Sequence, residues 1–133
     1  MTPTIGSRPW FDRYIAAFNA RDYAAFGRFY AADVDFRGQA ATLSGPDAIM
    51  EFYGRIHQQV DETVEVLAFV GSPVMVAAEL LTTLVSKGDW PDFPNGPMAA
   101  GERRQSRNFA FYDINADGQF TRIRTANFWR SAR

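Results

Sequence analysis

The chain has 133 residues, of which 47% are hydrophobic and 22% charged, and its formal net charge is -1. A chain of this length can build one sizeable core, so we expect a single domain over residues 1–133. Nucleic acids and anionic membranes attract proteins with a clear cationic excess, and the near-neutral charge therefore disfavours both as partners. The chain has no cysteine, which excludes disulfides, thiolate nucleophiles and cysteine-bound zinc. Without an apolar leader or a bilayer-spanning run of roughly 20 residues, it is expected to be cytoplasmic.

The first half of the sequence is predicted to be helical. After a tail of residues 1–7, Ser7 can cap a helix that ends near Asn19 and carries its aromatic and aliphatic residues on one face. Asp22 is the predicted cap of a second helix over residues 23–33, in which aromatic residues recur at three- and four-residue spacing. Both helices are amphipathic, so each needs an apolar surface to cover.

A short strand and a third helix follow. The strand is predicted around "VDFRG", residues 34–38. Ser44 and Asp47 then occupy positions like those of a capping box, and the apolar residues beyond them recur with helical spacing as far as Val60. This helix also presents one apolar face.

The second half is predicted to form four long strands. They are rich in β-branched and aromatic residues, are separated by turns or by a proline-rich loop, and span residues 63–70, 73–86, 103–114 and 119–129. Strands that follow one another in this way pair antiparallel. Helices that precede a long antiparallel sheet predict an α+β fold in which the sheet curls around the helices.

The proline-rich loop, residues 87–101, is far longer than the roughly two to five residues that a hairpin turn requires. Its three prolines stiffen it, while Trp90 and Phe93 carry large apolar surfaces. Such a loop is expected to dock, either on the mouth of its own pocket as a lid or on a second subunit. We therefore count Trp90 and Phe93 among the candidate ligand-binding residues.

The order of these elements, together with "RYIAAFNARDYAAFGRFYAADVDFRG" and "GPDAIMEFYGRI", resembles the nuclear transport factor 2-like superfamily. That superfamily includes SnoaL-like polyketide cyclases, ketosteroid isomerase and limonene epoxide hydrolase. The resemblance implies N-terminal helices packed in the concave face of a strongly curved antiparallel sheet, an apolar pocket between them, and frequent homodimers. Because this cone-shaped scaffold hosts unrelated activities, the resemblance indicates the fold rather than the reaction.

Two known sets of catalytic groups are incomplete in this chain. The resemblance to ketosteroid isomerase places Tyr14 at the position of its catalytic tyrosine, but Gly38 and Ala110 at the positions of its two aspartates. Without a base and an acidic donor, that reaction loses both groups that lower its barrier. Limonene epoxide hydrolase needs an arginine and two aspartates; Arg124 matches the arginine, and Thr125 replaces an aspartate.

Strand alternation predicts the lining of the pocket. If Ala110 faces the pocket, its neighbours at even spacing face it too. The candidate ligand-binding residues on the inner face are Asn108, Tyr112, Thr125, Asn127 and Trp129. An aromatic lining with neutral hydrogen-bonding groups suits a small hydrophobic molecule. The alternative is that Tyr112, Trp129 and Tyr14 only pack in the core.

Two ionisable residues, His57 and Glu79, each have two possible roles. The sole histidine, His57, lies near the end of the third helix, and it is either a proton shuttle at the pocket mouth or a structural residue of the helix boundary. Glu79 lies in an apolar strand, where burial would make it a base. The alternative places Glu79 on the outer sheet face, paired with Arg107 or Arg122.

No metal or cofactor is predicted. The segment "DINADGQFTRIR" begins like a calcium-binding loop, but Arg124 occupies the twelfth position, which a bidentate glutamate must fill. Asp117 and Gly118 are instead a hairpin-turn signal. His57 has no second histidine with which to bind a metal.

Two functions remain open. The first is an acid–base enzyme of the isomerase, dehydratase or cyclase type, with Tyr14 as a hydrogen-bond donor and no assigned base. The second is a non-catalytic ligand-binding or partner-stabilising module, again dimeric. A carboxylate or histidine within about 3 Å of the Tyr14 hydroxyl, or of one ordered water beside it, would favour the enzyme, because a proton acceptor must lie within hydrogen-bond reach.

Overall fold

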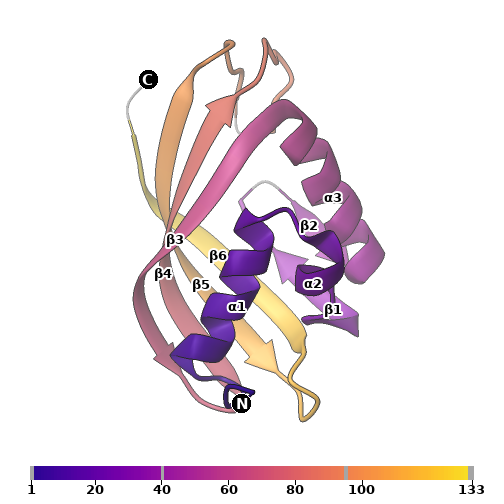
Figure 1. The fold of residues 1–133 in the computed structure, drawn as a ribbon. Coiled ribbons are helices and arrows are strands. Elements are labelled where there is room, and N and C mark those ends of the chain that lie inside the picture. Colours follow the sequence, from indigo (N-terminus) through magenta and orange to yellow (C-terminus); the bar gives the residue numbers. More distant parts are fainter. Residues whose placement is uncertain (1, 40, 95, 132–133) are drawn as a thin grey trace.

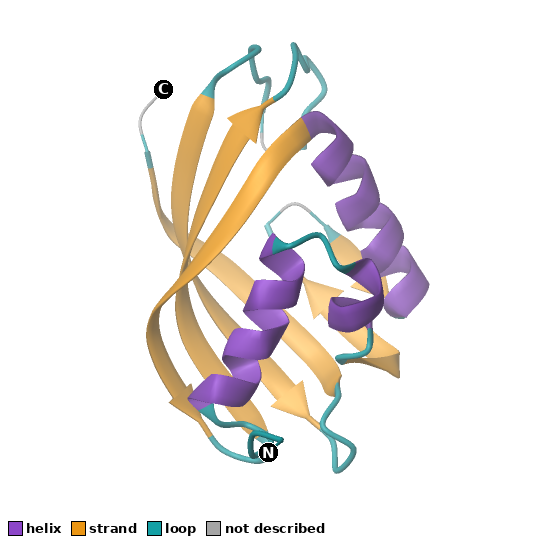
Figure 2. Ribbon diagram, in the orientation of Figure 1, coloured by secondary structure: helices purple, strands orange, loops and turns teal. Residues whose placement is uncertain are grey.

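The computed structural model describes residues 2–39, 41–94 and 96–131. Its elements are, in chain order, α1 (Arg8–Asn19), α2 (Tyr23–Gly27), β1 (Tyr30–Arg37), β2 (Thr42–Ser44), α3 (Pro46–Gln59), β3 (Val60–Gly71), β4 (Met75–Ser86), β5 (Arg103–Ile114) and β6 (Phe120–Arg130). Within the described residues, six strands form one sheet in the order β2-β1-β6-β5-β4-β3. The helices lie on one side of this curved, unclosed sheet (Figures 1 and 2). The predicted α+β fold is confirmed.

Strand pairing is antiparallel except at one position. β3, β4, β5 and β6 form consecutive antiparallel pairs, as the sequence predicts. β1 instead runs parallel to β6, and the short strand β2, which was not predicted, pairs antiparallel with β1. The sheet is therefore mostly antiparallel and mixed at one junction.

The structure has two of the three predicted N-terminal helix caps. Ser7 Oγ accepts a hydrogen bond from Trp10 N at 3.3 Å, and Asp22 Oδ1 accepts one from Ala25 N at 3.1 Å, so both predicted caps are confirmed. The capping box predicted for α3 is wrong. Gly45, with φ of 85°, precedes that helix, and no side chain caps it.

The predicted second helix over residues 23–33 is also wrong in length. α2 ends at Gly27, a weak helix former, and the chain becomes strand β1 at Tyr30. Tyr30 pairs with Phe120 of β6, and both side chains are buried. Burial in the sheet outweighs the helical spacing of these aromatic residues.

The core between α1 and the sheet is mainly aromatic. The buried face of α1 consists of Trp10, Phe11, Tyr14, Ile15 and Phe18, the face that the sequence predicts. The ring of Tyr14 meets that of Phe120 edge-on, with centroids 5.0 Å apart. Tyr14 also makes edge or tilted contacts with the rings of Phe29 and Tyr112. These rings fill the interior at the N-terminal end of the fold.

The end of α1 is attached to the free edge of β3. Asn19 Nδ2 donates to Val64 O at 2.8 Å, and Val64 N donates to Asn19 Oδ1 at 2.9 Å, so the amide acts as a neighbouring strand would. Arg21, in the left-handed region with φ of 58°, donates from its guanidinium to Phe18 O and to Glu62 O. These bonds fix the backbone of β3 at Glu62.

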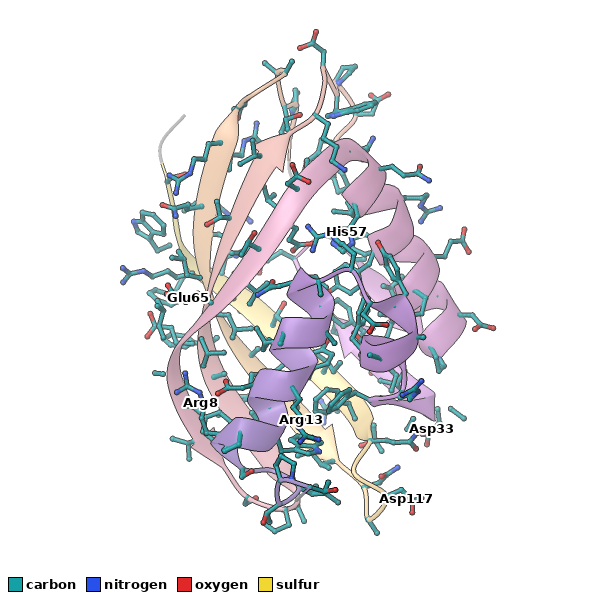
Figure 3. All side chains as sticks on the ribbon, in the orientation of Figure 1. Arg8, Arg13, Asp33, His57, Glu65 and Asp117 are labelled. Atoms are coloured by element: carbon teal, nitrogen blue, oxygen red, sulfur yellow. The ribbon has the colours of Figure 1, made fainter. Side chains whose placement is uncertain are left out.

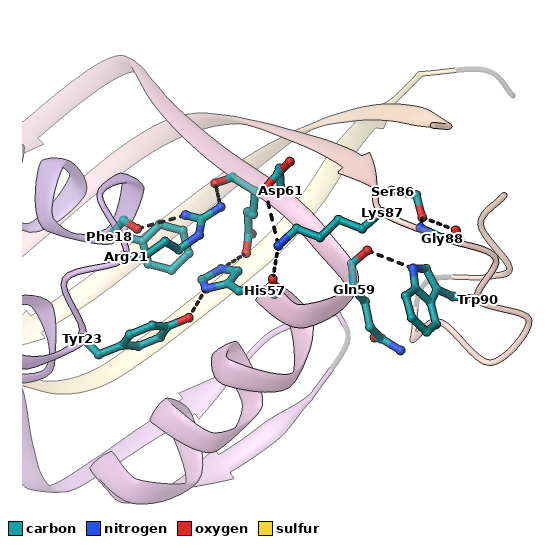
Figure 4. Close-up of polar contacts among 11 residues, drawn as sticks. Phe18, Arg21, Tyr23, His57, Gln59, Asp61, Ser86, Lys87, Gly88 and Trp90 are labelled. Atoms are coloured by element: carbon teal, nitrogen blue, oxygen red, sulfur yellow. Dashed lines mark hydrogen bonds and ion pairs between the residues drawn. The ribbon is translucent and has the colours of Figure 1, made fainter. Parts of the chain in front are cut away.

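The proline-rich loop docks on its own chain. Lys87 Nζ donates to His57 O at 2.7 Å, and Trp90 Nε1 donates to Gln59 O at 2.9 Å, so the loop satisfies carbonyls that the last turn of α3 leaves free (Figure 4). Phe93 is buried in a small apolar cluster with Ile56, Val60 and Met98. The loop therefore packs against α3 of its own chain.

The buried tyrosines predict how stability responds to alkaline pH. Burial raises the pKa of Tyr14, Tyr30, Tyr53 and Tyr112, whereas tyrosines of the unfolded chain ionise near about pH 10. Above that pH the folded state keeps protons that the unfolded state releases. The contribution of these tyrosines to the free energy of unfolding is therefore fully present below about pH 10 and is lost as pH rises beyond it.

We expect phenolate absorbance from these four residues to appear together with the loss of near-ultraviolet circular dichroism. The control is the same titration in denaturant, in which all five tyrosines of the chain should ionise normally. Gradual ionisation of the buried four with the circular dichroism intact would contradict the packed aromatic core.

Candidate acid–base site

A cavity of about 130 Å³ lies between α3, the concave face of the sheet and the proline-rich loop, and we call it the inner cavity. Its apolar wall includes Phe36, Phe52, Tyr53, Ile56, Leu84 and Phe93. Its polar wall includes Glu62, Thr82, Ser106, Asn108, Thr125 and Asn127. Among the described residues that line it, Glu62 is the only carboxylate. The chemistry of this cavity therefore depends on how Glu62 is held.

Glu62 is hydrogen-bonded to the only histidine of the chain. The side chains of His57 and Glu62 are 4% and 14% exposed, and His57 Nε2 lies 3.0 Å from Glu62 Oε1. His57 Nδ1 lies 2.7 Å from the Tyr23 hydroxyl (Figure 4). Because an ionised carboxylate only accepts, Nε2 carries the proton and donates it to Glu62; in the tautomer whose Nδ1 has no hydrogen, the Tyr23 hydroxyl donates a hydrogen bond to Nδ1.

One oxygen of Glu62 remains available. Oε1 accepts the bond from His57, and Oε2 has no hydrogen-bond partner among residues 2–39, 41–94 and 96–131. A carboxylate in a cavity wall, with one oxygen fixed and the other without a hydrogen-bond partner among the described residues, has the arrangement of a general base.

The position of His57 follows from the spacing of residues on α3. Tyr53 and His57 lie one turn apart and therefore share a face, and their rings stack with centroids 5.7 Å apart. Phe18 of α1 meets the imidazole edge-on at 5.3 Å. Figure 3 shows His57 between α3 and the sheet, whereas Glu65, three residues beyond Glu62 on β3, lies at the periphery. The imidazole is thus held by packing as well as by hydrogen bonds.

A second polar feature is a chain of amides on β5 and β6. Arg130 donates to Asn127 Oδ1 at 3.0 Å, and Asn127 Nδ2 donates to Asn108 Oδ1. Since a guanidinium can only donate, it fixes which end of each amide accepts. Asn108 Nδ2 has no acceptor among the described residues, so its hydrogens remain available as donors to a molecule in the inner cavity.

Several predicted site residues lie at or beside the inner cavity. Asn108, Thr125, Asn127 and Phe93 are in its wall. His57 lies behind the wall and contacts the cavity through Glu62. Trp90 lines a separate cavity beside α3 and the loop rather than the inner cavity.

Tyr14 and Tyr112 are buried in the aromatic core and do not line the inner cavity. The Tyr14 hydroxyl is hydrogen-bonded to the Tyr30 hydroxyl at 2.7 Å, so its close partner is neither a carboxylate nor a histidine. Among the described residues, the direct contact that would have favoured a catalytic Tyr14 is therefore not formed. The carboxylate–histidine pair lies elsewhere, at Glu62 and His57.

The prediction that Trp129 faces inward is wrong. Asn108 pairs with Asn127 and Arg107 with Trp129, so Phe128 is an extra residue that reverses the alternation of β6. Trp129 consequently lies on the outer face, 43% exposed, with the Arg107 guanidinium 5.6 Å from its ring centroid. Arg107 also lies 3.9 Å from Glu79, which confirms the outer-face alternative for that glutamate.

The sequence contained a signal for Glu62 that was not used. Along β3, Val60, Glu62, Val64 and Val66 share one face, and the valines of that face are buried or half-buried. A glutamate among three inward-facing valines is a buried carboxylate by strand alternation. Its partner could not be inferred, because His57 precedes the bend between α3 and β3.

Metal ligands do not gather in the part of the chain that the structure describes: no group of three or more histidine, aspartate or glutamate side chains there could hold an ion. The calcium-like segment forms a turn, in which Asn115 Oδ1 accepts from Asp117 N and Gln119 N. No helix among the described residues is long and apolar enough to cross a bilayer.

Comparison with known proteins gives a consistent result. Residues 11–123 match the SnoaL-like domain. A candidate polyketide cyclase from Xanthomonas campestris has a similar structure, with 27% identity, a TM-score of 0.70 and coverage of 86% of this chain and 84% of that chain. A Mycobacterium tuberculosis protein in complex with estradiol-17beta-hemisuccinate shows 18% identity, a TM-score of 0.68 and coverage of 90% and 89%. No curated protein matches the chain.

The Tyr14–Tyr30 pair gives a stability prediction. Tyr14→Phe leaves the buried Tyr30 hydroxyl without its partner, which should lower the free energy of unfolding by about 1–3 kcal/mol. Tyr30→Phe should cost a similar amount, and the double variant should cost less than the sum. Urea denaturation measures all three. Additive losses, or no loss, would show that the two hydroxyls do not interact.

Proposed function

The chain belongs to the SnoaL-like domain family, and we propose that it binds a small, largely apolar carbonyl compound in the inner cavity and catalyses acid–base chemistry on it. The observation that carries this proposal is the Glu62 carboxylate in the cavity wall, with Oε1 held by His57 and Oε2 available. The reaction class is an isomerisation, dehydration or cyclisation that begins with removal of a proton from the carbon next to the carbonyl.

Glu62 is the base in this proposal. Its Oε2 takes the proton, the electron pair of the broken C–H bond forms a C=C bond, and the π pair of the carbonyl moves onto its oxygen to give an enolate. Asn108 Nδ2 donates a hydrogen bond to that oxygen, where charge develops. Glu62 then returns the proton to another carbon in an isomerisation, to the departing hydroxyl group in a dehydration, or to the alkoxide formed when the enolate carbon attacks a second carbonyl in a cyclisation, which completes the cycle without a cofactor.

His57 and Tyr23 are positioning residues. The bond from Nε2 keeps one carboxylate oxygen occupied and leaves the other available for the bound molecule. Tyr23 keeps Nδ1 of neutral His57 as an acceptor, so that the proton of the ring stays on Nε2. The Glu62 side chain is only 14% exposed, and reduced contact with water strengthens the interactions of a carboxylate with a bound molecule.

A non-catalytic ligand-binding module is the second candidate. The steroid complex of the structural neighbour from Mycobacterium tuberculosis favours it, because that structure shows a small molecule bound by this fold. The two candidates predict the same binding and differ in whether Glu62 exchanges a proton with the bound molecule.

We further propose that the chain forms a homodimer through the outer face of the sheet. Phe109 and Phe128 stack there with centroids 4.3 Å apart, and they are 51% and 49% exposed. Leu67, Val70 and Phe111 are exposed large apolar residues of the same sheet. Exposed apolar residues gathered on one face of a sheet are typical of a protein interface.

Proton exchange tests the role of Glu62. With methyl 6-acetyl-2-naphthoate in deuterium oxide, we expect the protein to accelerate replacement of the acetyl protons by deuterium, followed by proton NMR. Glu62→Gln should lower the catalysed rate by about 100-fold or more, because the amide cannot accept the proton. Glu65→Gln, an exposed glutamate of the same strand, is the matched control and should exchange as the wild type does.

Binding of the ester, measured by its fluorescence, separates the two candidates. Binding without catalysed exchange in the wild type would support the ligand-binding module. Unchanged exchange in Glu62→Gln would remove Glu62 from the base position.

The dimer proposal is tested by solution mass. Sedimentation equilibrium should give twice the chain mass for the wild type, and Phe109→Asp should give the chain mass, because it places a charge in the apolar surface. Val74→Asp, an exposed apolar residue of the β3–β4 turn, should remain dimeric. A monomeric wild type would contradict the proposal.

A further inference from the structure

A second cavity adjoins the inner cavity, and we call it the mouth cavity. Its volume is about 160 Å³, and it shares Leu84, Ser106 and Asn127 with the wall of the inner cavity. Arg104 and Arg130 also line it. Ligand pockets usually measure about 300–1,000 Å³, so the inner cavity alone is small and a bound molecule would extend into the mouth cavity.

The two arginines of the mouth cavity differ in what they contact. The guanidinium of Arg104 is bonded to neighbouring residues of the chain. Its Nε pairs with Glu102 at 2.5 Å, and its other nitrogens donate to the carbonyls of Gly96 and Pro97. Arg130 donates to Asn127 Oδ1 and forms no ion pair with any described residue. Its positive charge is therefore available to a ligand.

The backbone holds Arg130 at this position. It pairs with Ser106 of β5, and the following residue closes the strand end: Ser131 N donates to Gln105 O at 2.8 Å, and Gln105 N donates to Ser131 Oγ at 3.0 Å. The guanidinium is also tied to Asn127, which belongs to the walls of both cavities. Arg130 is thus part of the cavity wall rather than a side chain of a loose end.

We propose that the mouth cavity binds a carboxylate substituent of the substrate through Arg130, while the neutral, carbonyl-bearing part of the same molecule lies beside Glu62. This inference rests on the proposed function, and it names the substrate class as a carbonyl compound with a carboxylate at its other end. A guanidinium matches a carboxylate because it can offer two parallel N–H donors.

The separation of charges sets the direction of binding. Among the described residues, Glu62 is the carboxylate of the inner cavity, and Arg130 is the cation of the mouth cavity that forms no ion pair. A substrate that entered carboxylate-first would bring two negative charges together, and its neutral end would leave Arg130 unmatched. The same charges that attract the correct orientation therefore exclude the reversed one.

The test compares 6-acetyl-2-naphthoate with its methyl ester, two probes that differ in one negative charge. The wild type should bind the acid about tenfold or more tighter than the ester, which is the gain expected of one charge-assisted hydrogen bond. Arg130→Gln should abolish this preference, and Arg130→Lys should restore most of it. Arg13→Gln, an exposed arginine of α1, is the matched control and should keep the preference.

Three outcomes would overturn the proposal. The wild type could bind acid and ester equally, the preference for the acid could survive in Arg130→Gln, or that variant could lose affinity for the acid and the ester by the same factor. The last would mean that Arg130 acts only by orienting the amides. The Glu62→Gln variant separates this proposal from the proposed function. The variant should still bind the acid more tightly than the ester, and this result does not depend on whether the wild type catalyses proton exchange.

Discussion

The hydrogen bond between His57 and Glu62 joins α3 to β3 at the point where the interior changes from packed rings to an open cavity. A carboxylate that is 14% exposed is costly unless it is paired or hydrogen-bonded. His57 meets that need from the end of α3, and Arg21 fixes the backbone of Glu62 from the end of α1. The position of the carboxylate therefore depends on elements from three parts of the chain, none of which could hold it alone.

The interior has two regions, a packed aromatic core and a cavity lined by polar groups. Toward the N-terminal end, rings from α1, β1, β5 and β6 pack together, and the hydroxyls of Tyr14 and Tyr30 satisfy each other. Toward the proline-rich loop, amides, hydroxyls and one carboxylate line a cavity that α3 and Phe93 cover. The first region gives the sheet a rigid base, and the second leaves polar groups free for a ligand. Tyr14 belongs to the first region, and for that reason Glu62, rather than Tyr14, carries the proposed chemistry.

The sequence predicts the fold more closely than the site, for physical reasons. Strong alternation between clear turns located β5 at residues 103–114, and the capping residues Ser7 and Asp22 located two helix starts. Local spacing failed where burial in the sheet determined the structure, as at Tyr30. It failed again at Phe128, where a single inserted residue turned Trp129 outward. Glu62 could be placed on an apolar face by alternation, but its pairing with His57 depends on how α3 turns into β3, which spacing alone does not show.

The most direct test of this account is the protonation of the His57 ring, measured by nitrogen-15 NMR at neutral pH in the unliganded protein. The chain has one histidine, so the signal needs no assignment. The account predicts a proton on Nε2 that exchanges slowly with solvent. The chemical shift of the Nε2 signal should change when Glu62 is replaced by Gln. A ring protonated only at Nδ1, or a freely exchanging ring that does not sense Glu62, would show that the buried pair does not form in solution.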